Sequence, residues 1–387
     1  MQRMFQVLAV LAIIFLIPAV GLTQKKDSGK DAKSYNELGL KELNKGKYDK
    51  AIDIFTKAIK ENKDFAPAYS NRGYAYYSKR EYDKALADFN KAIELLPKSA
   101  MLYNNRGLVY LAQRKLDKAV KDLNQAIKLN PKLASAYNYR GFIYFQQKDY
   151  SKAMADYNKA IELNPKYTLA YNNRGYAYYT LNKPDKAIED FNMAIKQNPD
   201  VIVAYNNRGL AYYDKKEYEK ALADFNKALK LNPKFAPVYD KRGLIYYEKE
   251  DYDKAIADFT KTIELEPRYV LAYNNRGLAY FQKKSYGKAI SDFNKAIKLD
   301  PKYANAYNNR GMTYYKQKAY DKAIADFTKA IELNPDLAVA YNNRAHAYNK
   351  QKAYSKAKED VKRAQDLKFE VDKELLENLQ KASGKKK

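Results

Sequence analysis

The chain has 387 residues and a net charge of +26, and 46% of its residues are apolar, enough to bury a substantial core. It has no Cys and a single His, His346, which excludes thiol nucleophiles, disulfides and zinc sites built from Cys and His. We therefore expect neither a metal nor a cofactor. The large positive charge favours anionic partners.

The first element is an apolar run at residues 4–22. Residues 7–16 have the length of a signal-peptide core, and small residues at cleavage spacing follow Pro18. An uncleaved anchor stays open, because the run is just long enough to span a bilayer. We interpret residues 1–24 as a signal peptide or N-terminal membrane anchor and residues 25–31 as a short polar linker. We therefore expect an exported (periplasmic or secreted) or membrane-anchored protein.

The rest of the chain is dominated by a repeat of 34 residues that no insertion interrupts. Glycine marks each of the first nine units, and Ala345 takes its place in the tenth. A tyrosine precedes each of these positions by four residues, and an alanine follows by twelve. The marking glycines are Gly39, Gly73, Gly107, Gly141, Gly175, Gly209, Gly243, Gly277 and Gly311.

One unit, residues 271–304, illustrates the structure expected of them all. Tyr273, Gly277 and Tyr280 lie at helical spacing, and a second helical pattern surrounds Phe293. A short turn at 283–285 separates the two patterns, and the residue before a proline ends the second. A hairpin this small cannot bury both of its faces, so neighbouring units must stack.

This pattern resembles the tetratricopeptide repeat family, with ten tandem repeats over residues 32–371. The resemblance implies an all-α fold, a right-handed superhelical α-solenoid of helix-turn-helix repeats whose first helices line a concave groove. Lys63 and Phe369 replace the family's proline in the first and last units. Residues 372–387 look like a C-terminal capping helix followed by a Lys-rich tail.

An arginine precedes the repeat glycine in nine units, and an aspartate follows each arginine by sixteen residues. In the first unit both are apolar, Leu38 and Ile54. The arginine and the aspartate occur together in nine units and are absent together in one, which indicates structural ion pairs between the two helices. The planar guanidinium of arginine can donate two parallel hydrogen bonds to a carboxylate. An arginine ladder that faces a ligand stays open as the alternative. The representative pairs are Arg174 with Asp190, Arg208 with Asp224, and Arg276 with Asp292.

Two asparagines precede most of these arginines, and an amide can pair with a peptide backbone in both directions. In some superhelical members of the family, concave asparagines hold an extended peptide in that way, and the alternative is hydrogen bonding between helices. The residues expected to bind peptide are Asn104, Asn105, Asn172, Asn173, Asn206, Asn207, Asn274, Asn275, Asn308 and Asn309.

An aromatic column follows the glycines by four residues and includes Tyr179, Tyr213, Tyr247 and Phe281. These rings are candidates to pack against ligand side chains, although packing between repeats also explains an aromatic stripe at helical spacing. A lysine before each repeat alanine forms a further column, which we interpret as a solvated face on the second helices.

These patterns predict a non-catalytic scaffold that binds extended peptides or partner proteins in the concave groove. The open alternative is a binder of anionic polymers or surfaces through the basic surface, namely acidic glycan, lipid headgroups or, least expected of the three, nucleic acid. Catalytic constellations are asymmetric, whereas this chain repeats its polar residues unit after unit, so we expect no enzyme. His346 has no counterpart in the other units, and we expect it to be incidental.

Overall fold

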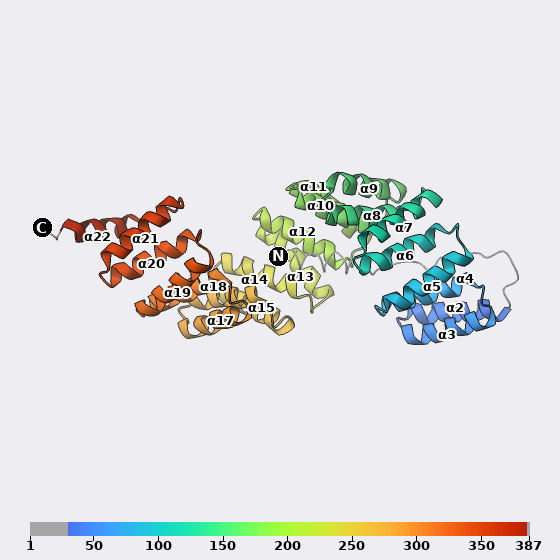
Figure 1. Ribbon diagram of the computed structural model, residues 1–387, viewed down its shortest axis with the longest axis horizontal. Coiled ribbons are helices and arrows are strands. Elements are labelled where there is room, and N and C mark those ends of the chain that lie inside the picture. Colours follow the sequence, from blue (N-terminus) through green and yellow to red (C-terminus); the bar gives the residue numbers. More distant parts are fainter. Residues whose placement is uncertain (1–29, 385–387) are drawn as a thin grey trace. The chain divides into compact units, whose positions relative to one another are not determined.

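The computed structural model describes residues 30–384, and within that range every regular element is an α-helix (Figure 1). The segment expected to be a signal peptide or anchor lies outside the described residues. None of the described helices combines the length and the apolar character needed to cross a membrane. Residues 25–29 of the expected linker also lie outside the described residues, and its last two residues belong to the first described helix, which begins at Lys30.

Helices α2 to α21 alternate as the first and second helices of the ten repeats, and α22 follows them (Figure 1). In chain order they are α2 (Lys30–Asn44), α3 (Tyr48–Glu61), α4 (Ala66–Ser78), α5 (Tyr82–Leu95), α6 (Ala100–Ala112), α7 (Leu116–Leu129), α8 (Ala134–Gln146), α9 (Tyr150–Leu163), α10 (Thr168–Thr180), α11 (Pro184–Gln197), α12 (Ile202–Asp214), α13 (Tyr218–Leu231), α14 (Ala236–Glu248), α15 (Tyr252–Leu265), α16 (Val270–Gln282), α17 (Tyr286–Leu299), α18 (Ala304–Lys316), α19 (Tyr320–Leu333), α20 (Ala338–Lys350), α21 (Tyr354–Asp366) and α22 (Lys373–Gly384).

The turn inside each repeat depends on one residue in the left-handed region. Between α16 and α17 this residue is Lys284, with φ at 57°. Its N–H donates to the carbonyl of Phe281, and the N–H of Ser285 donates to the carbonyl of Tyr280, so the last carbonyls of the first helix are satisfied. The second helix ends at Leu299, before the Asp300-Pro301 pair, as the sequence predicts.

The core of a repeat is a close approach of its two helices at the glycine. A Cβ placed on Gly277 would lie 2.7 Å from the Phe293 ring, which is fully buried. Ala289 and Ala296 flank that ring on the second helix and are equally buried. Small residues therefore bring the helices together, and one large ring fills the remaining space.

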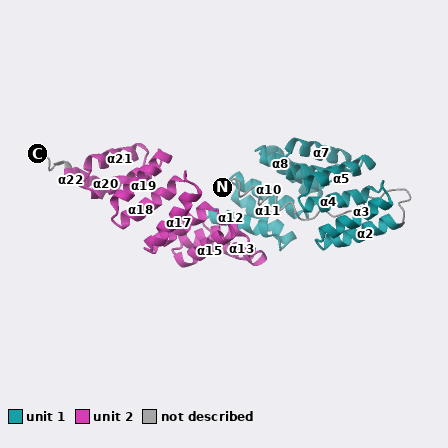
Figure 2. Ribbon diagram, turned by 60° about the horizontal axis from the view of Figure 1, so that its bottom comes forward, with its two compact units in different colours: residues 1–215 teal, residues 216–387 magenta. Residues whose placement is uncertain are grey.

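The chain divides into two compact units, residues 1–215 and 216–387 (Figure 2). Each is a stack of hairpins in which a second helix also packs against the first helix of the next repeat. At the C-terminal end, Leu375 and Leu379 of α22 are buried against Val361 and Ala364 of α21. This helix covers the apolar side of the last repeat, the place in which the sequence leads us to expect a cap.

Candidate functional site

The asparagine pairs lie between neighbouring first helices, where they bond to one another. In the C-terminal unit, Asn309 donates to Asn274 of the preceding repeat over 2.9 Å, and Asn274 in turn donates to Asn275 over 3.4 Å. In the N-terminal unit, Asn207 donates to Asn172 over 3.2 Å. The side chains form a relay that runs from repeat to repeat.

This arrangement corrects the role that we expected for the asparagines. Asn275 and Asn309 are half-buried and bonded within the relay, and the others are buried, Asn206 being only 1% exposed. Buried amides that satisfy each other are not available to hold a peptide. The buried members are Asn104, Asn105, Asn172, Asn173, Asn206, Asn207, Asn274 and Asn308.

Replacing Asn309 with alanine is expected to destabilise the C-terminal repeats by about 1–3 kcal/mol, because the buried Asn274 oxygen loses its donor. Chemical denaturation followed by circular dichroism measures the change. Lys298→Ala, an exposed helical site, is the control. Equal stability of the two variants would contradict an energetic role for the relay.

The seventh repeat departs from the asparagine pattern with Asp240 and Lys241. Asp240 is buried and accepts from Asn275 over 3.4 Å, and Lys241 Nζ lies 3.5 Å from the same carboxylate. Burial raises the pKa of Asp240, and Asp240 in turn raises the pKa of Glu266 beyond the effect of its own burial. In this repeat an acidic acceptor, Asp240, thus takes the place of the amide that accepts from the next repeat.

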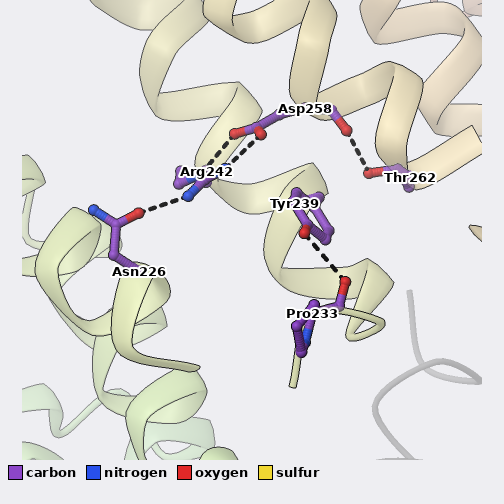
Figure 3. Close-up of polar contacts among 6 residues, drawn as sticks. All are labelled: Asn226, Pro233, Tyr239, Arg242, Asp258 and Thr262. Atoms are coloured by element: carbon purple, nitrogen blue, oxygen red, sulfur yellow. Dashed lines mark hydrogen bonds and ion pairs between the residues drawn. The ribbon is translucent and has the colours of Figure 1, made fainter. Parts of the chain in front are cut away.

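Repeat arginines hold their aspartates with two parallel hydrogen bonds, as the arginine of the seventh repeat shows. In Figure 3, Arg242 donates through Nε and Nη2 to the two oxygens of Asp258, each over 2.7 Å. Its third nitrogen, Nη1, donates to Asn226 of the preceding repeat over 2.6 Å. One guanidinium therefore joins the two helices of its own repeat and the helix before them.

The other predicted pairs of arginine and aspartate lie in equivalent positions of their repeats. Arg174 lies 2.7 Å from Asp190, and Arg276 lies 2.8 Å from Asp292. Arg208 donates to Asn192, and its predicted partner Asp224 is 4% exposed. Arginines held in this way are not free to form a ladder that faces a ligand.

Sequence reasoning missed the third partner of the arginines, although a signal was present. Asparagine or threonine stands sixteen residues before each repeat arginine, just as aspartate stands sixteen residues after it. Thr260, for example, accepts from Arg276 over 3.0 Å. Tyrosine rings complete these surroundings, with Tyr239 and Tyr246 at 5.5 and 5.9 Å from the Arg242 guanidinium.

The aromatic column remains half-exposed while it packs on its own repeat. Phe281 lies 5.8 Å from Tyr286, and Tyr247 lies 5.5 Å from Tyr252, ring centre to ring centre. Tyr179 and Tyr213 are half-exposed as well. Each ring therefore has a packing role and also presents an accessible edge.

Neighbouring repeats are joined across this column. Phe145 contacts Tyr176 of the next repeat with ring centres 5.6 Å apart, and Tyr179 donates from its hydroxyl to Asp214. In the C-terminal unit, Gln282 donates to the hydroxyl of Tyr247 over 3.2 Å. These contacts join the first helices of repeats four to six in the N-terminal unit, and those of repeats seven and eight in the C-terminal unit, along one side.

We call this side of the first helices the first-helix face and define it separately in each unit. It comprises the residues one, four and five positions after each glycine, from Gly73 to Gly209 in the N-terminal unit and from Gly243 to Gly277 in the C-terminal unit. Four members are buried, namely Leu108, Leu111, Phe142 and Leu210. The face carries no lysine or arginine, although the chain has 72. Its charged residues are Asp214 and Glu248. The large positive charge of the protein therefore lies elsewhere, and this face is nearly neutral, with many aromatic side chains.

Family models identify the class of protein. A model described as tetratricopeptide repeat matches residues 66–99, 100–133, 168–201, 202–235 and 304–337, and two others with that description match 32–65 and 327–359. A model described as TPR repeat matches 141–182, 243–284 and 277–318. The chain belongs to the tetratricopeptide repeat family, whose members typically mediate protein–protein interactions and are typically non-catalytic.

Solved structures of repeat proteins are similar over part of the chain. One is YrrB, described as a TPR protein with an unusual peptide-binding site, at 26% identity over 48% of this chain and 95% of its own, with a TM-score of 0.43. A repeat protein from Parabacteroides merdae is 24% identical over 65% and 99%, with a TM-score of 0.48. PilF of Pseudomonas aeruginosa is 20% identical over 57% and 96%, with a TM-score of 0.49. No curated protein matches the chain.

Proposed function

We propose that the chain is a non-catalytic scaffold that binds an extended segment of a partner protein along its first-helix face, in the concave groove expected of the family. The observation that carries this proposal is the run of half-buried aromatic side chains on the fourth and fifth repeats, where Phe145 contacts Tyr176 and Tyr176 contacts Tyr179. Rigid rings bury a large area at little cost in side-chain entropy, which suits them to the recognition of extended peptides.

The charge of the face supports a partner segment of low charge. A carboxylate-rich peptide would find no lysine or arginine on this face between Gly73 and Gly277. Exposed aliphatic and aromatic side chains of a partner would instead meet rings such as Tyr176 and Tyr179, whose centres are 6.3 Å apart. The Asp214 carboxylate is engaged by the Tyr179 hydroxyl, so it offers a polar edge beside the rings.

Selection from a random peptide library against the purified chain tests the proposal. We expect enriched peptides to be poor in charged residues and rich in aromatic and aliphatic ones. The affinity of the synthetic peptides, measured by fluorescence anisotropy, should change little with salt, because few ion pairs form. Tyr176→Ala with Tyr179→Ala should weaken binding about tenfold or more, the loss expected when anchor residues are truncated.

The matched control removes two exposed second-helix lysines of the same unit, Lys128→Gln with Lys196→Gln. This variant should bind as the parent chain does, and circular dichroism should show that both variants keep their helix content. Enrichment of acidic peptides whose affinity collapses as salt rises, and which the lysine variant no longer binds, would refute the proposal.

A further inference from the structure

The turns between the first and second helices of the last three repeats, which Figure 1 colours orange to red, are rich in lysine. The stretches 282–288, 316–322 and 350–356 contain nine lysines and one acidic residue, Asp321. Gln351 donates to Asp321 over 2.7 Å, which shows that neighbouring turns lie side by side. We call these nine lysines the C-terminal lysine patch.

The same part of the preceding three repeats is nearly neutral. Stretches 180–186, 214–220 and 248–254 contain seven basic and eight acidic residues. In the sixth and seventh repeats the lysine before the repeat alanine is paired, Lys220 with Glu217 and Lys254 with Asp251, each over 2.6 Å. In the patch, Ser285, Ala319 and Ala353 replace the acidic partner, so the corresponding lysines have no carboxylate at that position. The absence of these acids creates the patch.

Three lysines of the patch occupy backbone positions that lysine does not favour. Lys284, Lys318 and Lys352 have φ between 57° and 63°. In the first repeat the equivalent residue is Gly46, with φ at 72°, and glycine adopts this conformation without steric cost. The same conformation recurs in the other repeats at Arg80, Arg114, Lys148, Asn182, Lys216 and Glu250, so it belongs to the turn and does not by itself distinguish the patch.

We propose that the C-terminal lysine patch docks the repeats onto a bilayer that contains anionic phospholipid. Every basic residue of the patch is lysine, a flexible point charge, and one of the nine, Lys283, pairs with Asp253 of the preceding repeat. The arginines of the same repeats, Arg276, Arg310 and Arg344, are each held by an aspartate. Arginine suits bidentate recognition of defined phosphates, and clustered lysines suit the diffuse potential of a lipid surface.

The anchor interpretation of the apolar N-terminal run, one of the two left open by the sequence, would hold the repeats beside a bilayer. This inference is independent of peptide binding on the first-helix face, since most of the patch lies beyond that face. Each lysine near an anionic leaflet should raise the affinity about fivefold.

Flotation of the full chain with vesicles tests the proposal. Vesicles of phosphatidylcholine are compared with vesicles that also contain phosphatidylglycerol, so that any insertion of the N-terminal run contributes to both. We expect preferential binding to the anionic vesicles, weakened by salt. The variant Lys284→Gly, Lys318→Gly, Lys352→Gly should lose that preference about tenfold or more, and should melt at or above the temperature of the parent chain.

The matched control is Arg80→Gly, Arg114→Gly, Lys148→Gly, which removes three charges at equivalent strained turns with φ between 59° and 64°. It should gain stability in the same way and bind anionic vesicles within about twofold of the parent. Equal loss in both variants, no loss in either, or a lower melting temperature for the lysine variant alone would overturn the proposal. Binding of the parent chain to heparin or single-stranded DNA without binding to anionic vesicles would overturn it too.

Discussion

Replacing Asp258 with alanine is expected to lower the free energy of unfolding of the C-terminal repeats by about 3–5 kcal/mol. Asp258 is 5% exposed and accepts two hydrogen bonds from Arg242, each over 2.7 Å. Its removal leaves a mostly covered guanidinium that keeps its hydrogen bond to Asn226 but has lost both bonds to a carboxylate. Urea denaturation followed by circular dichroism measures the loss.

The first repeat supplies the rescue for this variant, because Leu38 and Ile54 take the places of arginine and aspartate there. The double change Arg242→Leu, Asp258→Ile should therefore recover most of the stability that Asp258→Ala removes, since no buried charge remains unpaired. A double variant as unstable as the single one would show that the pair itself, and not the unpaired charge, determines stability.

Replacing Phe293 with alanine is the second change with a large expected effect, about 3–5 kcal/mol of lost stability. The ring is fully buried and contacts Gly277, where an added Cβ would lie 2.7 Å from it. The two helices are held at that separation by their other contacts, so the cavity left behind cannot close completely. Thermal and urea denaturation, followed by circular dichroism, report the loss.

The third repeat provides the control, because Leu123 stands opposite Gly107 there and is fully buried. Phe293→Leu should accordingly cost about 1–2 kcal/mol, clearly less than alanine. Equal losses for leucine and alanine at this position would contradict the cavity as the cause, and would indicate that the aromatic ring itself is required.

Much of the fold follows from the sequence because the packing of each repeat is local. Gly277 and Phe293 are sixteen residues apart, and their pairing recurs with the same spacing along the chain. The turn at 283–285 and the end of α17 before Pro301 were predicted where the structure has them. The predicted arginines lie against aspartates in the same way, because the first repeat loses both members together and so reveals the partnership.

The asparagines show where sequence reasoning stops. A column such as Asn172 and Asn206 repeats every 34 residues whether it faces a ligand or the adjacent helix, because the period records only that successive units are alike. Stacking placed Asn207 within 3.2 Å of Asn172, and the two amides satisfy each other. The candidate site therefore moves to the aromatic side chains beside them.

The sequence by itself determined the repeat, its two helices, their turn and the partners within a hairpin, because these contacts join residues whose spacing along the chain is short and constant. Only the tertiary structure decided which polar side chains form hydrogen bonds between repeats, such as Asn226 with Arg242, and which side chains stay accessible. That choice depends on the angle at which one hairpin stacks on the next, which many side chains set together and no single spacing records.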